Sequence, residues 1–494
     1  MLLNVLRSCS VRCQATSRSI PSRLPLRSFI SSVLPRSNSP FSAARPAGIL
    51  TRANVTKSYL PGSRILRCMN QARLHSSAKT EQTSATADSA EPPPAPLPVL
   101  ANKTVGAWLL FSSTLVFAVI VVGGVTRLTE AGLSITEWRP ITGILPPLSH
   151  EEWMEEFDKY KATPEFKMLN SQATLDDFKF IFYMEWGHRI LGRLIGVAFI
   201  GPLAYFAMRK KINSSMTKRM LGLSLLLGAQ GAMGWYMVKS GLEESVLETP
   251  GAVPRVSQYR LASHLGLAFL LYLGMFGTGI AVIKDWKFAN GAAWSGAANQ
   301  NIANILQNPL VKRVKAASWV LTGLVFLTAL SGAFVAGLDA GLLYNEFPLM
   351  GGRLAPPADE LFDPAYAKSA DKSDLWWRNI FENPTTVQFD HRVLATTTYL
   401  GTAALYASTF KTAVRAALPP LTRTAITAAF AMANIQVLLG ISTLLYLVPV
   451  PLAAAHQAGS VMLLSAMTHV LITLRQPSAA ARLWRAAKAA AQKK

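Results

Sequence analysis

The stretch EWGHRILGRLIGVAFIGPLAYFAM, Glu185 to Met208, decides the fold because a histidine opens an apolar segment long enough to cross a bilayer. The arrangement returns in the second half of the chain as QFDHRVLATTTYLGTAALYASTF, Gln388 to Phe410. Two spans further along, each half has another histidine, His264 or His456. Four histidines at matching places predict a duplicated membrane protein with two axially ligated metal centres, most simply hemes.

The composition also indicates a membrane protein. Half of the 494 residues are apolar and only 15% are charged, which is too apolar for a soluble chain of this length. Long continuous apolar runs exclude a transmembrane barrel, whose strands alternate in polarity. We therefore expect an all-α membrane protein, with eight transmembrane helices forming two four-helix bundles related by a pseudo-twofold axis. The expected spans are 105–125, 186–208, 220–238, 261–283, 316–338, 391–410, 421–445 and 455–474.

The two halves share landmarks in the same order, which argues for internal duplication. Glu185-Trp-Gly-His188-Arg189 aligns with Gln388-Phe-Asp-His391-Arg392 at the second helix of each half. Further aligned pairs are Glu130-Ala-Gly-Leu with Asp339-Ala-Gly-Leu, Gln230-Gly-Ala-Met-Gly234 with Gln436-Val-Leu-Leu-Gly440, and His264-Leu-Gly with His456-Gln-Ala-Gly.

The N-terminal segment is typical of a mitochondrial transit peptide. Residues 1–75 contain twelve Lys or Arg and no Asp or Glu. Much of the net charge of +22 therefore belongs to the expected targeting sequence. A basic arm for nucleic acid is the rival interpretation, but no recognition module follows it, and we expect no nucleic-acid partner. The predicted organisation is a transit peptide at 1–78, a Pro-rich linker at 79–104, four-helix halves at 105–283 and 316–475, a matrix linker at 284–315 and a basic matrix tail at 476–494.

Charge in the connections predicts the orientation. Basic residues crowd the loops after the second, fourth and sixth spans and the tail, whereas residues 127–185 contain eleven Asp or Glu against six Lys or Arg. The positive-inside rule then places both termini in the matrix. All three cysteines lie in the expected transit peptide, so the mature chain would use no disulfide or thiolate.

The histidines of each half enter from the same side, so they can offer two imidazoles to opposite faces of one heme. A single histidine at a membrane interface more often turns its polar edge toward the headgroups, but four in register favour ligation. Zinc is less attractive, because two histidines and no cysteine fill half of its usual shell, even if Glu185 adds a third ligand. Nearby cations are either propionate contacts or interface anchors: Arg189, Arg193 and Arg392.

The main difference between the halves is Glu185 against Gln388, each three residues before its histidine and so on the same helix face. An ionisable carboxyl beside one metal site can exchange protons, whereas an amide cannot. The alternative is that Glu185 faces water or caps a helix. The asymmetry suggests that one heme is a cofactor and the other is a substrate.

The chain resembles the mitochondrial heme A synthase family from about Val105 to Leu474. The resemblance lies in GGVTRLTEAGLSITEWRPITGILPP (123–147), EWGHRILGRLIG (185–196), the His264 region, FDHRVLA (389–395) and HQAGS (456–460). It implies an enzyme of the mitochondrial inner membrane that oxidises the C8 methyl group of heme O to a formyl group, giving heme A for cytochrome c oxidase.

By position, the resemblance makes His391 and His456 ligands of a resident heme b and Glu185 the catalytic carboxyl. His188 and His264 would hold the heme O substrate, with both hemes toward the intermembrane space. Implied partners are heme O synthase, a ferredoxin electron donor and membrane lipid, and a homo-oligomer stays open. Bacterial relatives of one type have a cysteine pair in the first outer loop, and this chain has none. The alternatives are a diheme b-type electron-transfer protein and, less well supported, a transport protein.

Overall fold

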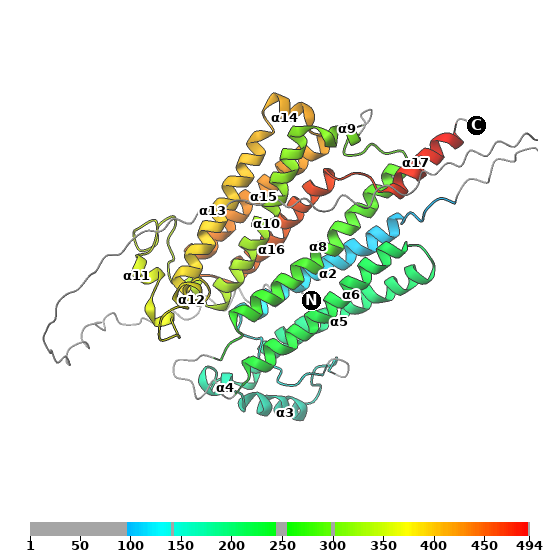
Figure 1. Ribbon diagram of the computed structural model, residues 1–494. Helices are drawn as coiled ribbons and strands as arrows, with labels where there is room; N and C mark the ends of the chain where they lie inside the picture. Colours follow the sequence, from blue (N-terminus) through cyan, green and yellow to red (C-terminus); the bar gives the residue numbers. More distant parts are fainter. Residues whose placement is uncertain (1–95, 140–142, 244–253, 298–301, 493–494) are drawn as a thin grey trace, which may run out of the picture. The chain divides into compact units, whose positions relative to one another are not determined.

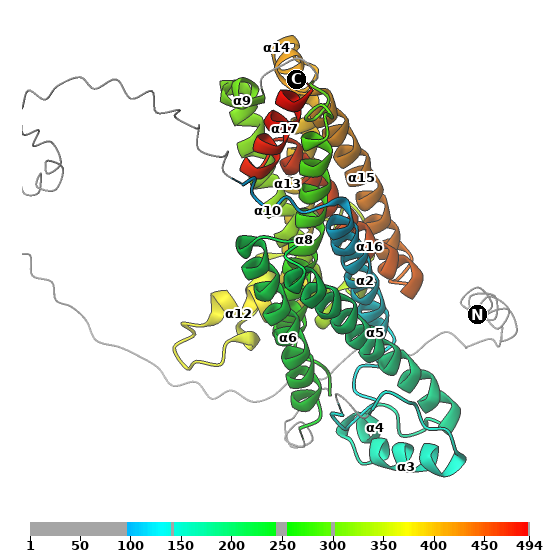
Figure 2. The same cartoon turned by 90° about the vertical axis from the view of Figure 1, so that its right-hand side faces the viewer.

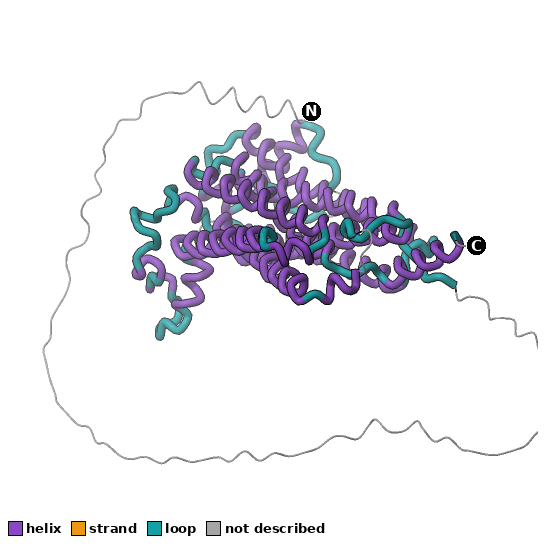
Figure 3. The backbone as a smooth tube through the Cα atoms, turned by 90° about the horizontal axis from the view of Figure 1, so that it is seen from above, coloured by secondary structure: helices purple, strands orange, loops and turns teal. Residues whose placement is uncertain are grey.

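The computed structural model describes residues 96–139, 143–243, 254–297 and 302–492. These residues are almost entirely helical and contain no β-strand, only two isolated bridges in loops (Figure 3). The expected all-α fold is confirmed. The expected transit peptide at 1–78 and most of the expected linker lie outside the described residues.

Eight long helices make up the two halves (Figure 1). The first half contains α2 (Lys103–Leu128), α5 (Leu175–Met208), α6 (Ser214–Gly241) and α8 (Gln258–Ala289). The second contains α10 (Pro309–Gly337), α13 (Pro384–Ser408), α15 (Pro420–Leu445) and α16 (Val450–Thr473). The shorter helices are α3 (His150–Lys161), α4 (Pro164–Met168), α9 (Ile302–Gln307), η2 (Ala340–Leu342), α11 (Ala358–Leu361), η3 (Pro364–Tyr366), α12 (Leu375–Glu382), α14 (Thr412–Ala417) and α17 (Ala479–Ala491).

Each half uses the same four helix pairings. In the first half α2 packs against α5 and α8, and α6 packs against the same two helices. In the second half α10 packs against α13 and α16, and α15 does likewise. The halves meet where α16 contacts α2 and α8 and where α10 contacts α8 (Figures 1 and 2). Matching pairings are what a duplicated unit requires, and the pseudo-twofold axis itself stays a prediction.

Seven of the eight expected spans are helices long and apolar enough to cross a membrane. The remaining one, α13, is a continuous helix of 25 residues. It is more polar than the others because it contains several threonines and the run Gln388-Phe-Asp-His-Arg392. Part of this polarity lies on the buried side of the helix, at Gln388, Thr398 and Thr402, whereas Thr396 and Thr397 are exposed.

The helices that carry the histidines begin earlier than the apolar runs predict. Helix α5 starts at Leu175, where the Thr174 side chain accepts from the Asp177 N–H and the Asp177 carboxylate accepts from the Thr174 N–H. This reciprocal cap stabilises a helix of 34 residues, about 50 Å long, against a hydrocarbon core of about 30 Å. His188 therefore lies well inside α5 and does not open it.

The first turns of α5 pack against α3 and α4 of the outer segment through buried aromatic rings. Phe178 is fully buried and stacks on Phe157 and Tyr160 with ring centroids 5.1 and 5.2 Å apart. Trp153 meets Phe182 edge-on with centroids 5.0 Å apart. We call these five residues the outer aromatic cluster, and it joins α3 to the first turns of α5. Phe166 of α4 packs edge-on against Phe157 and Tyr160, which attaches α4 to the cluster.

The two ends of the described chain lie together. The indole N–H of Trp484 in α17 donates to the carbonyl of Pro98, just before α2, at 2.8 Å. Helix α17 also packs along α8. The expectation that both termini face one side fits this contact, and the assignment of that side to the matrix stays a prediction.

Phe178→Ala should release the outer segment from α5. Removing a fully buried ring at the centre of the outer aromatic cluster costs about 3–5 kcal/mol. Limited proteolysis should then cut residues 150–168 much faster than in the wild type. The matched control is Phe180→Ala on the same helix, because that side chain is 57% exposed. Equal cleavage of the two variants would show that the cluster does not hold the segment.

Candidate functional site

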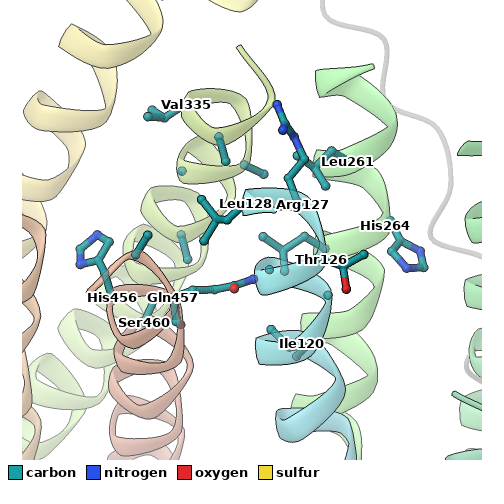
Figure 4. Close-up of a pocket in the computed structure, with 18 of the residues that line it drawn as sticks. Ile120, Thr126, Arg127, Leu128, Leu261, His264, Val335, His456, Gln457 and Ser460 are labelled. Atoms are coloured by element: carbon teal, nitrogen blue, oxygen red, sulfur yellow. Dashed lines mark hydrogen bonds between the residues drawn. The ribbon is translucent and has the colours of Figure 1, made fainter. Parts of the chain in front are cut away.

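One large cavity brings together the predicted site residues. Its volume is about 1440 Å³, above the ~300–1,000 Å³ of an ordinary pocket for one small ligand. Both halves contribute to its lining, which includes His188, His264, His391 and His456. The rings of His264 and His456 point away from each other on opposite sides of the view in Figure 4. The cavity therefore contains two histidine regions, one in each half.

Each histidine ring lies against a glycine of a neighbouring helix. A Cβ atom on Gly123 would lie 2.7 Å from Cε1 of His188, and one on Gly440 would lie 2.8 Å from Cε1 of His456. Both distances are shorter than any normal carbon contact, so the glycine makes room for the ring. The other two pairs are looser, with a Cβ on Gly332 3.4 Å from His391 and one on Gly234 3.6 Å from His264.

The helix packing places the two histidine helices of each half on either side of a shared pair of helices. In the first half α2 and α6 each contact both α5 and α8, and so hold the two histidine helices across the cavity. His188 lies within electrostatic range of His264, and His391 within range of His456. The structure thus groups the four histidines into the two pairs that the sequence predicts.

The halves differ in what contacts the second nitrogen of each ring. Ser331 Oγ lies 2.7 Å from His391 Nδ1 and donates its own hydrogen to the Thr328 carbonyl. The serine oxygen therefore accepts from Nδ1–H, which leaves Nε2 of His391 with its lone pair. The Gln436 amide lies 3.2 Å from His456 Nδ1.

Among the described residues of the first half, no side chain hydrogen-bonds to the buried Nδ1 atoms of His188 and His264. The residue before Gly123 is Val122, where the second half has Ser331 before Gly332. Gln230 corresponds to Gln436, but its amide donates only to the His264 carbonyl, at 3.1 Å. Both second-half imidazoles are oriented by side chains, and both first-half imidazoles lack this support.

Glu185 is buried and surrounded by donors. Its Oε2 accepts from Ser134 Oγ and the Ile135 N–H, both at 2.8 Å. Its Oε1 accepts from Arg189 Nη2 at 2.6 Å and Nε at 3.1 Å. Glu185 neither faces water nor caps a helix, because it lies inside α5 and its oxygens meet a fixed set of donors. These contacts also occupy it, which weakens the case for Glu185 as a third zinc ligand.

Gln388 occupies the matching position with a different set of contacts. Its amide donates to the carbonyls of Ala340 at 2.9 Å and Tyr344 at 3.3 Å. Its oxygen accepts from Arg392 Nη2 at 3.4 Å, and the same nitrogen donates to Tyr344 at 2.8 Å. At this position the second half therefore keeps the arginine and the loop contacts, but it has an amide in place of the carboxyl.

The arginines near the histidines reach loop carbonyls as well as the cavity. Arg189 donates to the carbonyls of Ile135 and Glu137, both at 2.9 Å, in addition to its pair with Glu185. Arg193 donates to the Arg139 carbonyl at 2.8 Å, and Arg392 to Leu349 at 3.0 Å. All three line the cavity. Arg189 is mainly engaged in holding Glu185, and contacts between these arginines and propionates stay predictions.

Sequence patterns did not predict the roles of several residues in or beside the cavity. Asp339 joins the two halves, because it pairs with Arg127 and with Arg255, each at 3.0 Å. Ser331 and Glu165 also escaped notice, since one lies in an apolar run and the other in an acidic loop. The aligned glutamines Gln230 and Gln436 were a usable signal, because polar residues inside spans mark sites.

The donor set fits heme iron. Within the described ranges no group of three or more His, Cys, Asp or Glu side chains could hold a metal ion. Two imidazoles suit an iron whose remaining positions are filled by a porphyrin. Gly192, one turn after His188, lines the cavity, and a Cβ there would meet no atom within 4 Å, so there is space beside the histidine for a flat ring.

Comparison with known proteins gives the family. The model of the COX15-CtaA family, described as cytochrome oxidase assembly protein, matches residues 106–468. The chain belongs to this family. The matched residues include all or most of each long helix and all four histidines.

Members of the cytochrome oxidase assembly family with curated names are similar over most of the chain. Heme A synthase COX15 of Saccharomyces cerevisiae is 47% identical over 378 residues, 76% of each protein. Heme A synthase COX15 of Homo sapiens is 45% identical over 376 residues, 76% of this chain and 84% of the human one. A heme A synthase-mitochondrial ferredoxin fusion protein of Schizosaccharomyces pombe is 49% identical over 366 residues, 74% of this chain and 59% of the fusion.

Gly123→Ala should displace the His188 ring and lower the heme content of the first half. The added methyl would lie 2.7 Å from Cε1 of His188, so the imidazole must move away from its present position in the cavity. The heme content and absorption spectrum of the purified protein measure this loss. Gly201→Ala on α5 is the control, because its Cβ meets open space and should leave the spectrum unchanged. An unchanged spectrum in Gly123→Ala would contradict the close ring–glycine contact.

Proposed function

We propose that this chain is a heme A synthase, a heme-dependent oxidoreductase that converts heme O to heme A for cytochrome c oxidase. The observation that carries the proposal is identity of 45–47% to heme A synthases over three quarters of the chain, joined to a cavity with two buried histidine pairs. The alternative function, a diheme protein that passes electrons without altering either heme, is not favoured, because it gives Glu185 no role. The site lies in a mitochondrial inner-membrane protein, with both termini in the matrix and the hemes toward the intermembrane space.

In this proposal His391 and His456 hold the resident heme b. The contact of Ser331 supports the assignment of His391, because a hydroxyl oxygen that accepts from Nδ1–H orients the ring and strengthens the Nε2 ligand. Gln436 meets His456 through an amide nitrogen, which cannot accept a hydrogen bond, so this contact holds the ring without supporting ligation through Nε2. Loss of such partners typically lowers metal affinity about 10- to 100-fold. When bound, heme b supplies a one-electron redox centre beside the substrate region. A heme that stays bound through many turnovers requires this higher affinity.

His188 and His264 then hold heme O, which must enter and leave in every turnover. Their Nδ1 atoms have no side-chain partner, so ligation is weaker and exchange is faster than in the second half. Arg193 and Arg392 contact propionates in this scheme, with Arg189 a less available third contact. Weak ligation in the first half suits a substrate that becomes a product.

Glu185 acts as the carboxyl that exchanges protons with the substrate carbon. Arg189, Ser134 and the Ile135 N–H fix its oxygens, so the group is positioned before the substrate arrives. Oxidation of a methyl group to a formyl group through hydroxylated forms releases protons, and Glu185 accepts them. Arg189 is a positioning residue, because it acts through Glu185.

A ferredoxin is the proposed electron donor, and heme O synthase the proposed source of substrate. The Schizosaccharomyces pombe relative is named as a fusion with a mitochondrial ferredoxin, which supports the first of these partners. The second follows from the chemistry, since a membrane-embedded, water-insoluble heme needs a membrane-bound supplier.

Extraction of bound heme tests the function. The purified protein should yield heme b together with heme O, a hydroxylated form or heme A by chromatography and mass spectrometry. His391→Ala should lose heme b, whereas His188→Ala should lose the second heme and keep heme b. Two equivalents of heme b in the wild type would instead identify a diheme electron-transfer protein. Loss of the same heme from both variants would contradict the assignment of the halves.

Glu185→Gln should bind heme O but form little heme A. Removing one acid–base group typically lowers a rate about 100-fold or more, while the amide keeps the shape and most hydrogen bonds of the site. Heme extracts of membranes that also make heme O measure the ratio of heme A to heme O. Asp176→Asn on the same helix is the control, because its side chain is 91% exposed. Normal heme A formation in Glu185→Gln would remove the carboxyl from the mechanism.

A further inference from the structure

A second buried carboxyl, Glu165, faces the first-half side of the cavity. It belongs to α4 of the outer segment, and only 3% of its surface is exposed. It lines the same cavity as Glu185 and His188. Its Oε2 is buried, and no residue in the described ranges hydrogen-bonds to it. The Thr163 cap and the outer aromatic cluster fix α4, so the free carboxyl oxygen is held there by the fold.

The surroundings of Glu165 favour its neutral form. Burial is the main cause, and the negative charges of Glu185 on α5 and Glu130 after α2 add to it, raising the pKa of Glu165 to about 8. Tyr160 on α3, a further titratable neighbour, has its own pKa raised by burial and by Glu165. Among the described residues no cation forms a salt bridge with Glu165. A carboxyl in this setting carries a proton at neutral pH and can give it up.

Glu185 is equally buried but differs in its contacts. Arg189 and two further donors meet its oxygens, and each of these contacts favours the charged carboxylate. Two carboxyls on one cavity, one with donors on its oxygens and one without, can divide the roles of general base and general acid. The two come from different elements, α4 and α5, which the outer aromatic cluster holds together.

We propose that Glu165 is the proton donor that works opposite Glu185 on the substrate carbon. The proposal rests on the proposed function and adds to it a second residue for the last step. In that step the geminal diol R–CH(OH)₂ becomes R–CHO and water. Glu185 takes the proton of one hydroxyl, the C–O bond of the other breaks, and the leaving oxygen takes the proton of Glu165. No electron is gained or lost, and Glu185 returns the proton to Glu165 through water.

The reverse of this step gives a test that needs no oxidation. Purified protein loaded with heme A is placed in water enriched in ¹⁸O, and mass spectrometry follows the label entering the formyl oxygen. The wild type should exchange faster than heme A free in detergent at the same pH. Glu165→Gln should bind heme A with an unchanged absorption spectrum and exchange about 100-fold more slowly. Glu151→Gln, an exposed acid on α3, should exchange like the wild type.

The pH profile gives a second readout that needs no variant. Glu165 donates only while protonated, so the protein-dependent exchange of the wild type should fall as the pH rises through about 8. Glu165→Gln should lack this fall, and Glu165→Asp should keep it at a lower rate. If a variant does not fold, the pH profile of the wild type still decides the question.

The outcomes separate the two proposals. Wild-type exchange that stays level from pH 7 to 9, or full exchange in Glu165→Gln, overturns the role of Glu165 and leaves heme A synthesis standing. Failure of the wild type to bind heme A, or exchange no faster than that of free heme A, contradicts the proposed function itself. Slow exchange in Glu165→Gln with intact binding and a lost pH dependence supports the donor.

Discussion

The close approach of each imidazole to a glycine is the constraint on which the rest of the structure depends. A side chain at membrane depth cannot rely on water, so its polar ring must be enclosed by protein. Gly123 and Gly440 allow neighbouring helices to reach the rings of His188 and His456 without a clash. The helix pairings of both halves, and the cavity between them, follow from keeping four rings in this position.

The two halves share these helix pairings but differ in the polar groups around their histidines. The second half supplies partners to both imidazoles, through Ser331 and Gln436, and a neutral amide at Gln388. The first half leaves its imidazoles without such partners and places two carboxyls, Glu185 and Glu165, around its part of the cavity. Firm ligation on one side and acid–base groups on the other suit a cofactor and a substrate, respectively.

Sequence patterns predicted the four histidines, their pairing and the contrast of Glu185 with Gln388, because duplication places equivalent residues in equivalent surroundings. The start of α5 was missed, since hydropathy reports where a helix enters lipid and the cap at Thr174 reports where the helix begins. Ser331 was missed because one serine in an apolar span is ordinary. Glu165 was missed because the position of α4 depends on packing among aromatic residues of three separate helices, which no local pattern reveals.

The recurrence of the ring–glycine contact has a historical consequence. If the halves arose by duplication, as their matching landmarks indicate, a single four-helix unit already had both contacts, and two copies of it would form a symmetric dimer with two identical sites. Fusion of the copies into one chain freed each site to change alone, and the later substitutions needed only to alter polar groups around rings already in place. The division of labour between two hemes could thus arise without any change in helix packing.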